Sequence, residues 1–62
     1  MSEKQTILII EDERAISNFI SRALVANDYR VISAFSGREG LSLLFSHGPD
    51  LVLLDLGLPD MD

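Results

Sequence analysis

Two groups of acidic residues lie where carboxylates could carry out chemistry. Glu11-Asp12-Glu13 directly follows the apolar run TILII, and Asp55 ends a second apolar run, LVLL, shortly before a Gly and a Pro. Carboxylates that converge in one cleft repel each other and tend to raise at least one pKa, unless a cation neutralises them. Mg²⁺ suits oxygen-only ligands and keeps several waters, which leaves positions open for a phosphoryl oxygen. With such an ion, one carboxylate can attack phosphorus and form an aspartyl phosphate.

The positions of these acids suggest separate roles. Asp55 stands alone at the end of a strand-like run and is the candidate nucleophile, whereas the adjacent pair Glu11 and Asp12 is better suited to holding the ion. A calcium site is disfavoured because no EF-hand spacing occurs. A simpler interpretation stays open, in which Glu11-Asp12-Glu13 only caps a helix and Asp55 only caps a turn at the end of its strand.

Apolar spacing predicts the elements of the first half of the chain. Thr6 to Ile10 is typical of a strand covered on both faces. From Arg14 to about Asn27, apolar residues recur at the spacing of one buried helical face, which consists of Ile16, Phe19, Ile20, Ala23 and Leu24. Asn27-Asp28 tolerates left-handed backbone and is expected to end this helix.

The second half predicts a strand, a helix and a third strand. Arg30 to Phe35 is less uniformly apolar than the first run, which favours an edge strand. Ser36 and Glu39 form an S-x-x-E capping box that opens a second helix, and a Gly-Pro pair ends it. The core stripe of this helix is expected to be Leu41, Leu44 and Phe45. Asp50 to Asp55 is the third strand.

This alternation of strands and helices is typical of a parallel sheet with right-handed crossovers. Two sheet orders are plausible: 3-2-1 makes the second strand central, and 2-1-3 makes the first strand central. The fully apolar first run favours 2-1-3. Because neighbouring strands are about 4.8 Å apart, that order brings Asp12 and Asp55 into one pocket at the carboxyl ends of the strands, where doubly wound sheets bind ligands.

Composition narrows the class of protein. The chain has 62 residues, enough for one small domain, and its lack of cysteine indicates a cytoplasmic compartment without disulfides. A single histidine, His47, excludes a multi-histidine zinc site. Ten acidic residues against five basic ones give a net charge of −5, so the chain itself is not expected to contact nucleic acid. The N-terminal MSEKQ predicts neither a signal peptide nor a membrane anchor.

Taken together, these residues resemble the receiver domains of two-component response regulators. The resemblance rests on the paired acids in LIIEDE, the strand-ending acid in LVLLDLGLPD, the Pro four positions after that acid and the βαβαβ spacing between them. It covers nearly the whole chain. The wording EDERAI with DLGLPDMD is most similar to the OmpR class and, within it, to the KdpE-type regulators.

The resemblance implies a phospho-accepting module of a two-component system that regulates transcription. It implies a flavodoxin-like (CheY-like) fold, with residues 1–62 as the N-terminal half of the receiver domain and the DNA-binding output domain absent. Asp55 would be the phosphate acceptor and would share Mg²⁺ with Glu11, Asp12 and the backbone carbonyl of Gly57. A sensor histidine kinase or a small phosphodonor would supply the phosphate.

A complete receiver continues through two more strands and three more helices, which carry a Ser or Thr and a Lys that contact the phosphoryl group. Lys4 does not match that Lys position, so we expect a truncated and impaired receiver. The alternative function is a non-catalytic half-domain. Its third strand would be a bare edge, and two copies could pair there into a homodimer with a six-stranded sheet.

These residues fit the active sites of known enzyme classes less well than they fit a receiver domain, and we do not expect the chain to be an enzyme. Haloacid-dehalogenase-type phosphatases also use a strand-ending Asp and Mg²⁺, but they need a second Asp two residues later, where Gly57 stands. A nucleotide-binding fold needs a Gly-rich loop after the first strand, where Glu11-Asp12-Glu13 would repel phosphate. His47 is expected to be a solvated residue near the end of a helix rather than a phosphorelay group.

Overall fold

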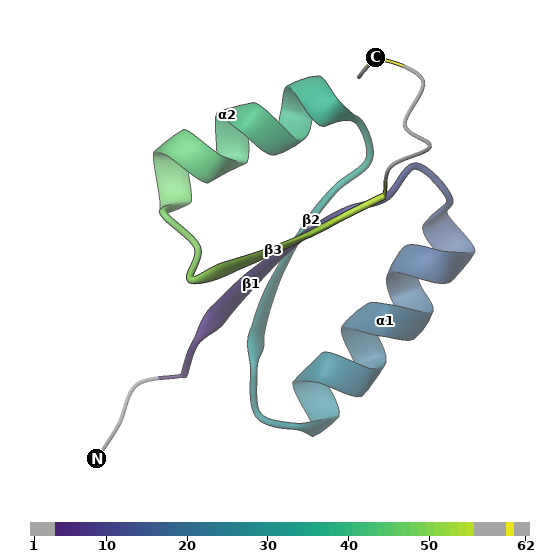
Figure 1. Ribbon diagram of the computed structural model, residues 1–62. Helices are drawn as coiled ribbons and strands as arrows, with labels where there is room; N and C mark the ends of the chain where they lie inside the picture. Colours follow the sequence, from purple (N-terminus) through teal and green to yellow (C-terminus); the bar gives the residue numbers. More distant parts are fainter. Residues whose placement is uncertain (1–3, 56–59, 61–62) are drawn as a thin grey trace.

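A computed structural model describes residues 4–55 and 60 of the chain (Figure 1). These residues form three strands and two helices in the predicted alternation. In chain order they are β1 (Thr6–Ile10), α1 (Arg14–Ala26), β2 (Arg30–Ala34), α2 (Gly37–His47) and β3 (Leu51–Leu54). The predicted bounds are correct to within one residue at most ends.

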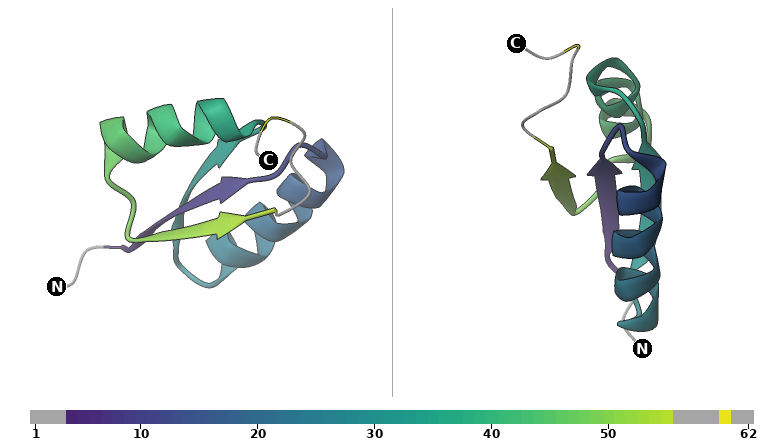
Figure 2. Two further views of the ribbon diagram at one scale, coloured as in Figure 1. Left: turned by 45° about the horizontal axis from the view of Figure 1, so that its top comes forward. Right: turned by 90° about the vertical axis from the view of Figure 1, so that its right-hand side faces the viewer.

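The strands form a parallel sheet in the order β2-β1-β3, which confirms the predicted order and the flavodoxin-like half-domain. Ile10 of β1 pairs with Ala34 on one side and with Leu54 on the other. Figure 2 shows β1 and β3 side by side, with their arrows pointing to the end of the sheet where α1 begins. As predicted, β1 is the central strand, and its residues Leu8 and Ile9 are almost completely buried.

The two helices lie on opposite faces of the sheet (Figure 1), and both pack against β1 and β2. The main core lies under α2, where Leu8, Ile10 and Ala34 are buried together. The partly buried residues Ile32, Leu43, Leu44 and Val52 surround this cluster. The strand β1 is covered on both faces, whereas the outer strands β2 and β3 are only partly covered. The sequence composition predicted this difference.

The predicted inner face of α1 is partly wrong. Ile20 and Leu24 are half-buried as expected, but Ile16 and Phe19 are 42% and 76% exposed. Ala23 is exposed as well, and Ser17 is buried in their place. The physical reason is that α1 touches only β1 and β2, so the sheet covers a narrow strip of a wider apolar arc.

The predicted core stripe of α2 also needs correction. Leu44 packs against the core, but Leu41 and Phe45 are 49% and 84% exposed. Two glycines, Gly37 and Gly40, are buried instead, because α2 approaches the sheet closely at its N-terminal half. A Cβ atom at Gly40 would lie 2.8 Å from Ile10 Cγ1, closer than real Cβ contacts. The face of α2 that lies closest to the sheet is therefore the one that carries the glycines, and Leu41 and Phe45 point away from the sheet.

Both ends of α2 follow the predicted chemistry. The Ser36 side chain accepts a hydrogen bond from the Glu39 amide at 3.1 Å, as a capping box requires. The Glu39 carboxylate reaches back to the amide of Phe35 at 2.8 Å, one residue before the cap. Gly48 ends the helix with φ of 55°, a left-handed conformation that glycine adopts without strain. Within residues 4–55 and 60, neither helix has the length and apolar character needed to cross a bilayer.

Candidate metal and phosphoryl site

The predicted acidic residues meet at the carboxyl end of the sheet. One carboxylate oxygen from each of Glu11, Asp12 and Asp55 lies within 4.8 Å of the others. Sheet hydrogen bonds continue past the strand ends and fix this arrangement. The Glu11 amide donates to the Ala34 carbonyl at 3.0 Å, and the Asp55 amide donates to the Ile10 carbonyl at 3.0 Å. Glu11 and Asp55 are therefore each held by a neighbouring strand.

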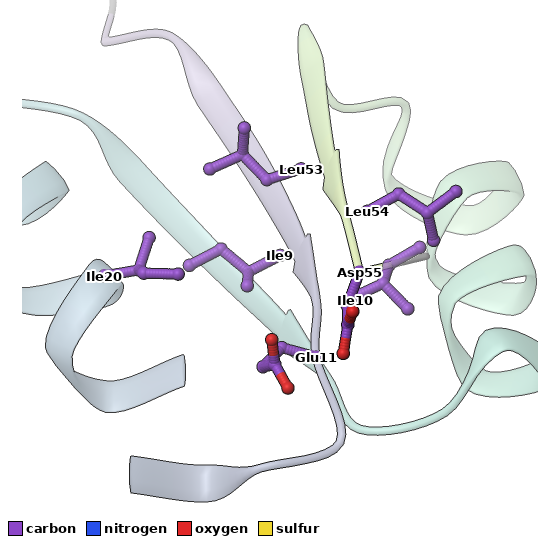
Figure 3. A pocket seen from close by; sticks show the side chains of 7 residues that line it. All are labelled: Ile9, Ile10, Glu11, Ile20, Leu53, Leu54 and Asp55. Atoms are coloured by element: carbon purple, nitrogen blue, oxygen red, sulfur yellow. The ribbon is translucent and has the colours of Figure 1, made fainter. Parts of the chain in front are cut away.

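The three carboxylates differ in exposure. Glu11 is buried, Asp55 is half-buried and Asp12 is exposed to solvent. The Glu11 carboxylate also accepts a hydrogen bond from the Glu13 amide at 3.0 Å, which fixes its orientation. Figure 3 shows the Glu11 and Asp55 carboxylates beside each other at the ends of β1 and β3. The site therefore has a rigid inner side and an open outer side.

A backbone hydrogen bond, burial and charge repulsion act together on the pKa of Glu11. The hydrogen bond from the Glu13 amide lowers this pKa, but burial and the nearby Asp55 carboxylate act in the opposite direction. Side-chain hydrogen bonds to Asp55 and Asp12 add to that effect, and the pKa of Glu11 is raised overall. This is the raised pKa expected for acids that converge without a cation.

A pocket adjoins the cluster. Its apolar walls come from β1, α1 and β3, and its acidic side is formed by Glu11 and Asp55 (Figure 3). The apolar residues that line it are Ile9, Ile10, Ile20, Leu53 and Leu54. Apolar walls lower the local dielectric and strengthen the interaction of the carboxylates with any cation placed between them.

The donor set fits Mg²⁺. This ion takes oxygen ligands at about 2.0–2.1 Å in octahedral geometry, so opposite ligands lie about 4.2 Å apart. Because the three carboxylate oxygens already lie within 4.8 Å of one another, small side-chain adjustments would bring them to these distances. The exposed side, next to Asp12, leaves room for the waters that Mg²⁺ retains.

The structure separates the metal-site interpretation from the simpler capping interpretation. The N-cap of α1 is Glu13, and the Glu13 side chain makes no capping hydrogen bond. The first turn of α1 contains no acidic residue. A side-chain cap of α1 by this acidic run is therefore not found, whereas the interpretation of Asp55 as a turn cap stays open. Gly57, the predicted carbonyl ligand, lies outside the described residues.

Sequence reasoning missed two contacts near this end of the sheet. The Arg14 guanidinium lies 4.0 Å from the centre of the Phe35 ring. The carboxylate of Asp60 accepts hydrogen bonds from the amides of Gly37 and Arg38 at 2.8 and 2.9 Å. No local sequence pattern predicts the contact between Asp60 and Arg38, because these residues are more than twenty positions apart. His47 is exposed, as expected, and bonds to the Ser46 hydroxyl.

Comparison with known proteins agrees with this geometry. Residues 7–62 match the response regulator receiver domain. The chain is 46% identical over 56 residues to the KDP operon transcriptional regulatory protein KdpE of Escherichia coli K12. It is 42% identical over 57 residues to the transcriptional regulatory protein AfsQ1 of Streptomyces coelicolor, and 43% identical over 56 residues to the response regulator MprA of Mycolicibacterium vanbaalenii.

These matches cover 90–92% of this chain but only 24–25% of each relative, so the chain spans about a quarter of their length. They confirm the resemblance to OmpR-class regulators of the KdpE type. The family match extends over the two strands that carry the acidic cluster and over both helices. The chain therefore belongs to the response regulator receiver domain family.

Proposed function

We propose that Asp55 accepts a phosphoryl group in a site that holds Mg²⁺ between Glu11, Asp12 and Asp55. The observation that carries this proposal is the convergence of three carboxylates within 4.8 Å at the ends of adjacent parallel strands. The backbone carbonyl of Gly57 is proposed as a further ligand on the family resemblance. Bound Mg²⁺ would neutralise charge on the transferring phosphoryl group.

The residues of the chain divide the remaining work. A carboxylate oxygen of Asp55 attacks phosphorus, and the bond between phosphorus and the donor atom breaks, so that the electron pair leaves with the donor. The product is an acyl phosphate on Asp55. Glu11, whose carboxylate is oriented by the Glu13 amide, would help to hold the ion. Asp12 lies on the solvent side, where the donor would approach.

We further propose the setting of a two-component system. The donor would be a phosphohistidine of a sensor kinase, and the output would be control of transcription by another part of the protein. Residues 1–62 would then form the N-terminal half of the receiver domain, without direct contact to DNA. The relative from Escherichia coli is named as a transcriptional regulator, which supports this setting. Because the phosphate stays on Asp55, the chain would act as an acceptor rather than as an enzyme.

Phosphorylation with a small donor tests the proposal. The chain is incubated with Mg²⁺ and an acyl phosphate or phosphoramidate, and its mass is measured. We expect a gain of one phosphate that survives acid but is lost in base or hydroxylamine. Asp55→Asn should abolish the gain and EDTA should prevent it, whereas Asp50→Asn, a carboxylate at the opposite end of β3, should leave it intact. An unchanged mass of the wild-type chain would refute the proposal.

The alternative function, a structural half-domain that self-associates, stays a prediction. The observation that favours it is the exposed edge strand β3, where Leu51, Leu53 and Leu54 are 53%, 37% and 44% exposed. Sedimentation velocity at micromolar concentration distinguishes the two functions. Dimers that form without Mg²⁺ and persist in Asp55→Asn support self-association, and a folded monomer contradicts it.

A further inference from the structure

The carboxylate of Asp60 closes the N-terminus of α2. Its Oδ1 accepts from the Gly37 amide at 2.8 Å and its Oδ2 from the Arg38 amide at 2.9 Å. The first amides of a helix have no partner within the helix. Ser36 accepts hydrogen bonds from the next two amides. Its hydroxyl accepts from the Glu39 amide and its carbonyl accepts from the Gly40 amide. All of these donors are therefore occupied.

Asp60 is held there as an anion. The Arg38 amide and then the Gly37 amide lower the pKa of the Asp60 carboxyl, and the positive charge of the Arg38 side chain adds to this. A carboxylate at a helix N-terminus also gains from the helix dipole. Hydrogen bonds of this charge-assisted kind are about twice as strong as neutral ones. The contact is a two-point attachment of residue 60 to α2.

The same part of α2 is attached rigidly to the strand that carries the acidic cluster. Gly40, in the first turn of α2, packs on Ile10 so closely that a Cβ atom would lie 2.8 Å from Ile10 Cγ1. Ile10 precedes Glu11 in the chain, and its carbonyl accepts the Asp55 amide at 3.0 Å. A continuous series of close contacts therefore links Asp60, through α2, to both strands of the cluster.

The chain that leaves the phosphoacceptor is thus held at two described points. One is Asp55, whose amide is bonded to β1, and the other is Asp60, five residues later, whose carboxylate is bonded to α2. Contacts that hold a binding site in one geometry before the ligand arrives reduce the conformational entropy that is lost on binding. Such outer contacts orient metal ligands and affect the affinity for the ion.

We propose that Asp60 is a positioning residue for the divalent-ion site, acting through its two hydrogen bonds to the N-terminus of α2. Asp60 does not touch the ion. It fixes the first turn of α2, which packs on Ile10 next to Glu11, and so preorganises the site for Mg²⁺. This inference rests on the proposed function, because it assumes that the acidic cluster binds a divalent ion.

The test compares two carboxylates that each hold a backbone amide. Asp60→Ala removes the contact to α2. Asp50→Ala is the matched control, because Asp50 Oδ2 accepts from the Thr6 amide at 2.7 Å at the opposite end of the sheet. Mg²⁺ affinity is measured by isothermal titration calorimetry on the 62-residue chain, at a temperature where each variant is folded by circular dichroism. We expect Asp60→Ala to weaken Mg²⁺ binding about tenfold, and Asp50→Ala to bind as the wild type does.

Two further measurements separate positioning from loss of folding. Asp60→Asn keeps one acceptor oxygen, so its Mg²⁺ affinity should lie between those of the wild type and Asp60→Ala. Amide hydrogen exchange at Gly37 and Arg38 should accelerate in Asp60→Ala, while exchange in β1 stays slow.

The outcomes distinguish this inference from the function on which it rests. If the wild-type chain binds Mg²⁺ and Asp60→Ala binds it equally well, the inference is overturned and the proposed function stands. If Asp50→Ala weakens binding as much as Asp60→Ala, the effect is general destabilisation and the inference is again overturned. If the wild-type chain binds no Mg²⁺, both fail together.

Discussion

Removing one charge from the acidic cluster should stabilise the metal-free chain. Asp55 lies within 4.8 Å of two other carboxylates, and two unit charges at that distance repel by about 1 kcal/mol in bulk water and by more where apolar walls lower the dielectric. Asp55→Asn keeps the shape of the side chain but replaces one carboxylate oxygen by an amide NH₂ group, which removes the charge. We therefore expect the free energy of unfolding to rise by about 1 kcal/mol, which corresponds to an increase of about 4–8 °C in Tm for a domain of this size.

The assay is thermal unfolding followed by far-UV circular dichroism at about pH 8, where carboxylates are ionised, in the presence of EDTA. Asp28→Asn is the matched control, since it changes the net charge by the same amount. Asp28 is exposed, its φ of 70° suits Asn, and its ion pair with Lys4 at 3.4 Å is a surface pair. Its stability should stay within about 0.5 kcal/mol of the wild type.

Adding Mg²⁺ should then reverse the order of stability. Binding to the folded state stabilises the wild type, but Asp55→Asn has lost a charged ligand and should gain much less. Two results would refute the electrostatic reasoning. One is a lower Tm of Asp55→Asn than of the wild type in EDTA, and the other is an equal gain from Mg²⁺ in both chains.

Two other predictions concern α2. Gly40→Ala places a methyl group against Ile10. The overpacking penalty of about 1–3 kcal/mol exceeds the helix-propensity gain of about 1 kcal/mol, so urea denaturation should show a lower free energy of unfolding. A second substitution, Ile10→Val, should restore part of that stability. Exposed Ser42→Ala in the same helix should not destabilise. Because the pKa of Asp60 lies below its ordinary value of 3.8, its stabilising contribution is present above that value and is lost as the pH falls through the depressed pKa. The stability difference between wild type and Asp60→Asn should therefore shrink on acidification below about pH 4, and a constant difference would contradict this.

Local patterns were sufficient to predict the elements and the convergence of the acidic residues. The β-branched run of β1, the capping box at Ser36 and the left-handed Gly48 each act over a few residues, so they can be read from the chain. The sheet order followed from the contrast between β1, apolar on both faces, and the mixed composition of β2. Once that order is set, Glu11 and Asp55 must meet, because the ends of neighbouring parallel strands lie together.

The helix faces could not be predicted in the same way. Apolar periodicity assumes that the widest apolar arc is buried, but here a three-stranded sheet covers only a strip of each helix. Buried Ser17 and Gly40 carry no apolar signal, and exposed Phe19 and Phe45 carry a misleading one. The contact of Asp60 with α2 is equally invisible, because nothing in the sequence near either partner specifies the other.

The exposed edge strand and the acidic cluster are thermodynamically connected. Leu53 and Leu54, both exposed, line the same pocket as Glu11 and Asp55. Any chain that packs on β3 removes water from this pocket and increases the cost of keeping two carboxylates charged. If the cluster binds a divalent ion as proposed, the ion relieves that cost. Burial of β3 would then strengthen ion binding, and by linkage ion binding would favour burial of β3 by the same free energy. Dimers that already form through this strand without Mg²⁺ should then become tighter when Mg²⁺ is added, and Asp55→Asn should lose this added tightening while keeping the dimer.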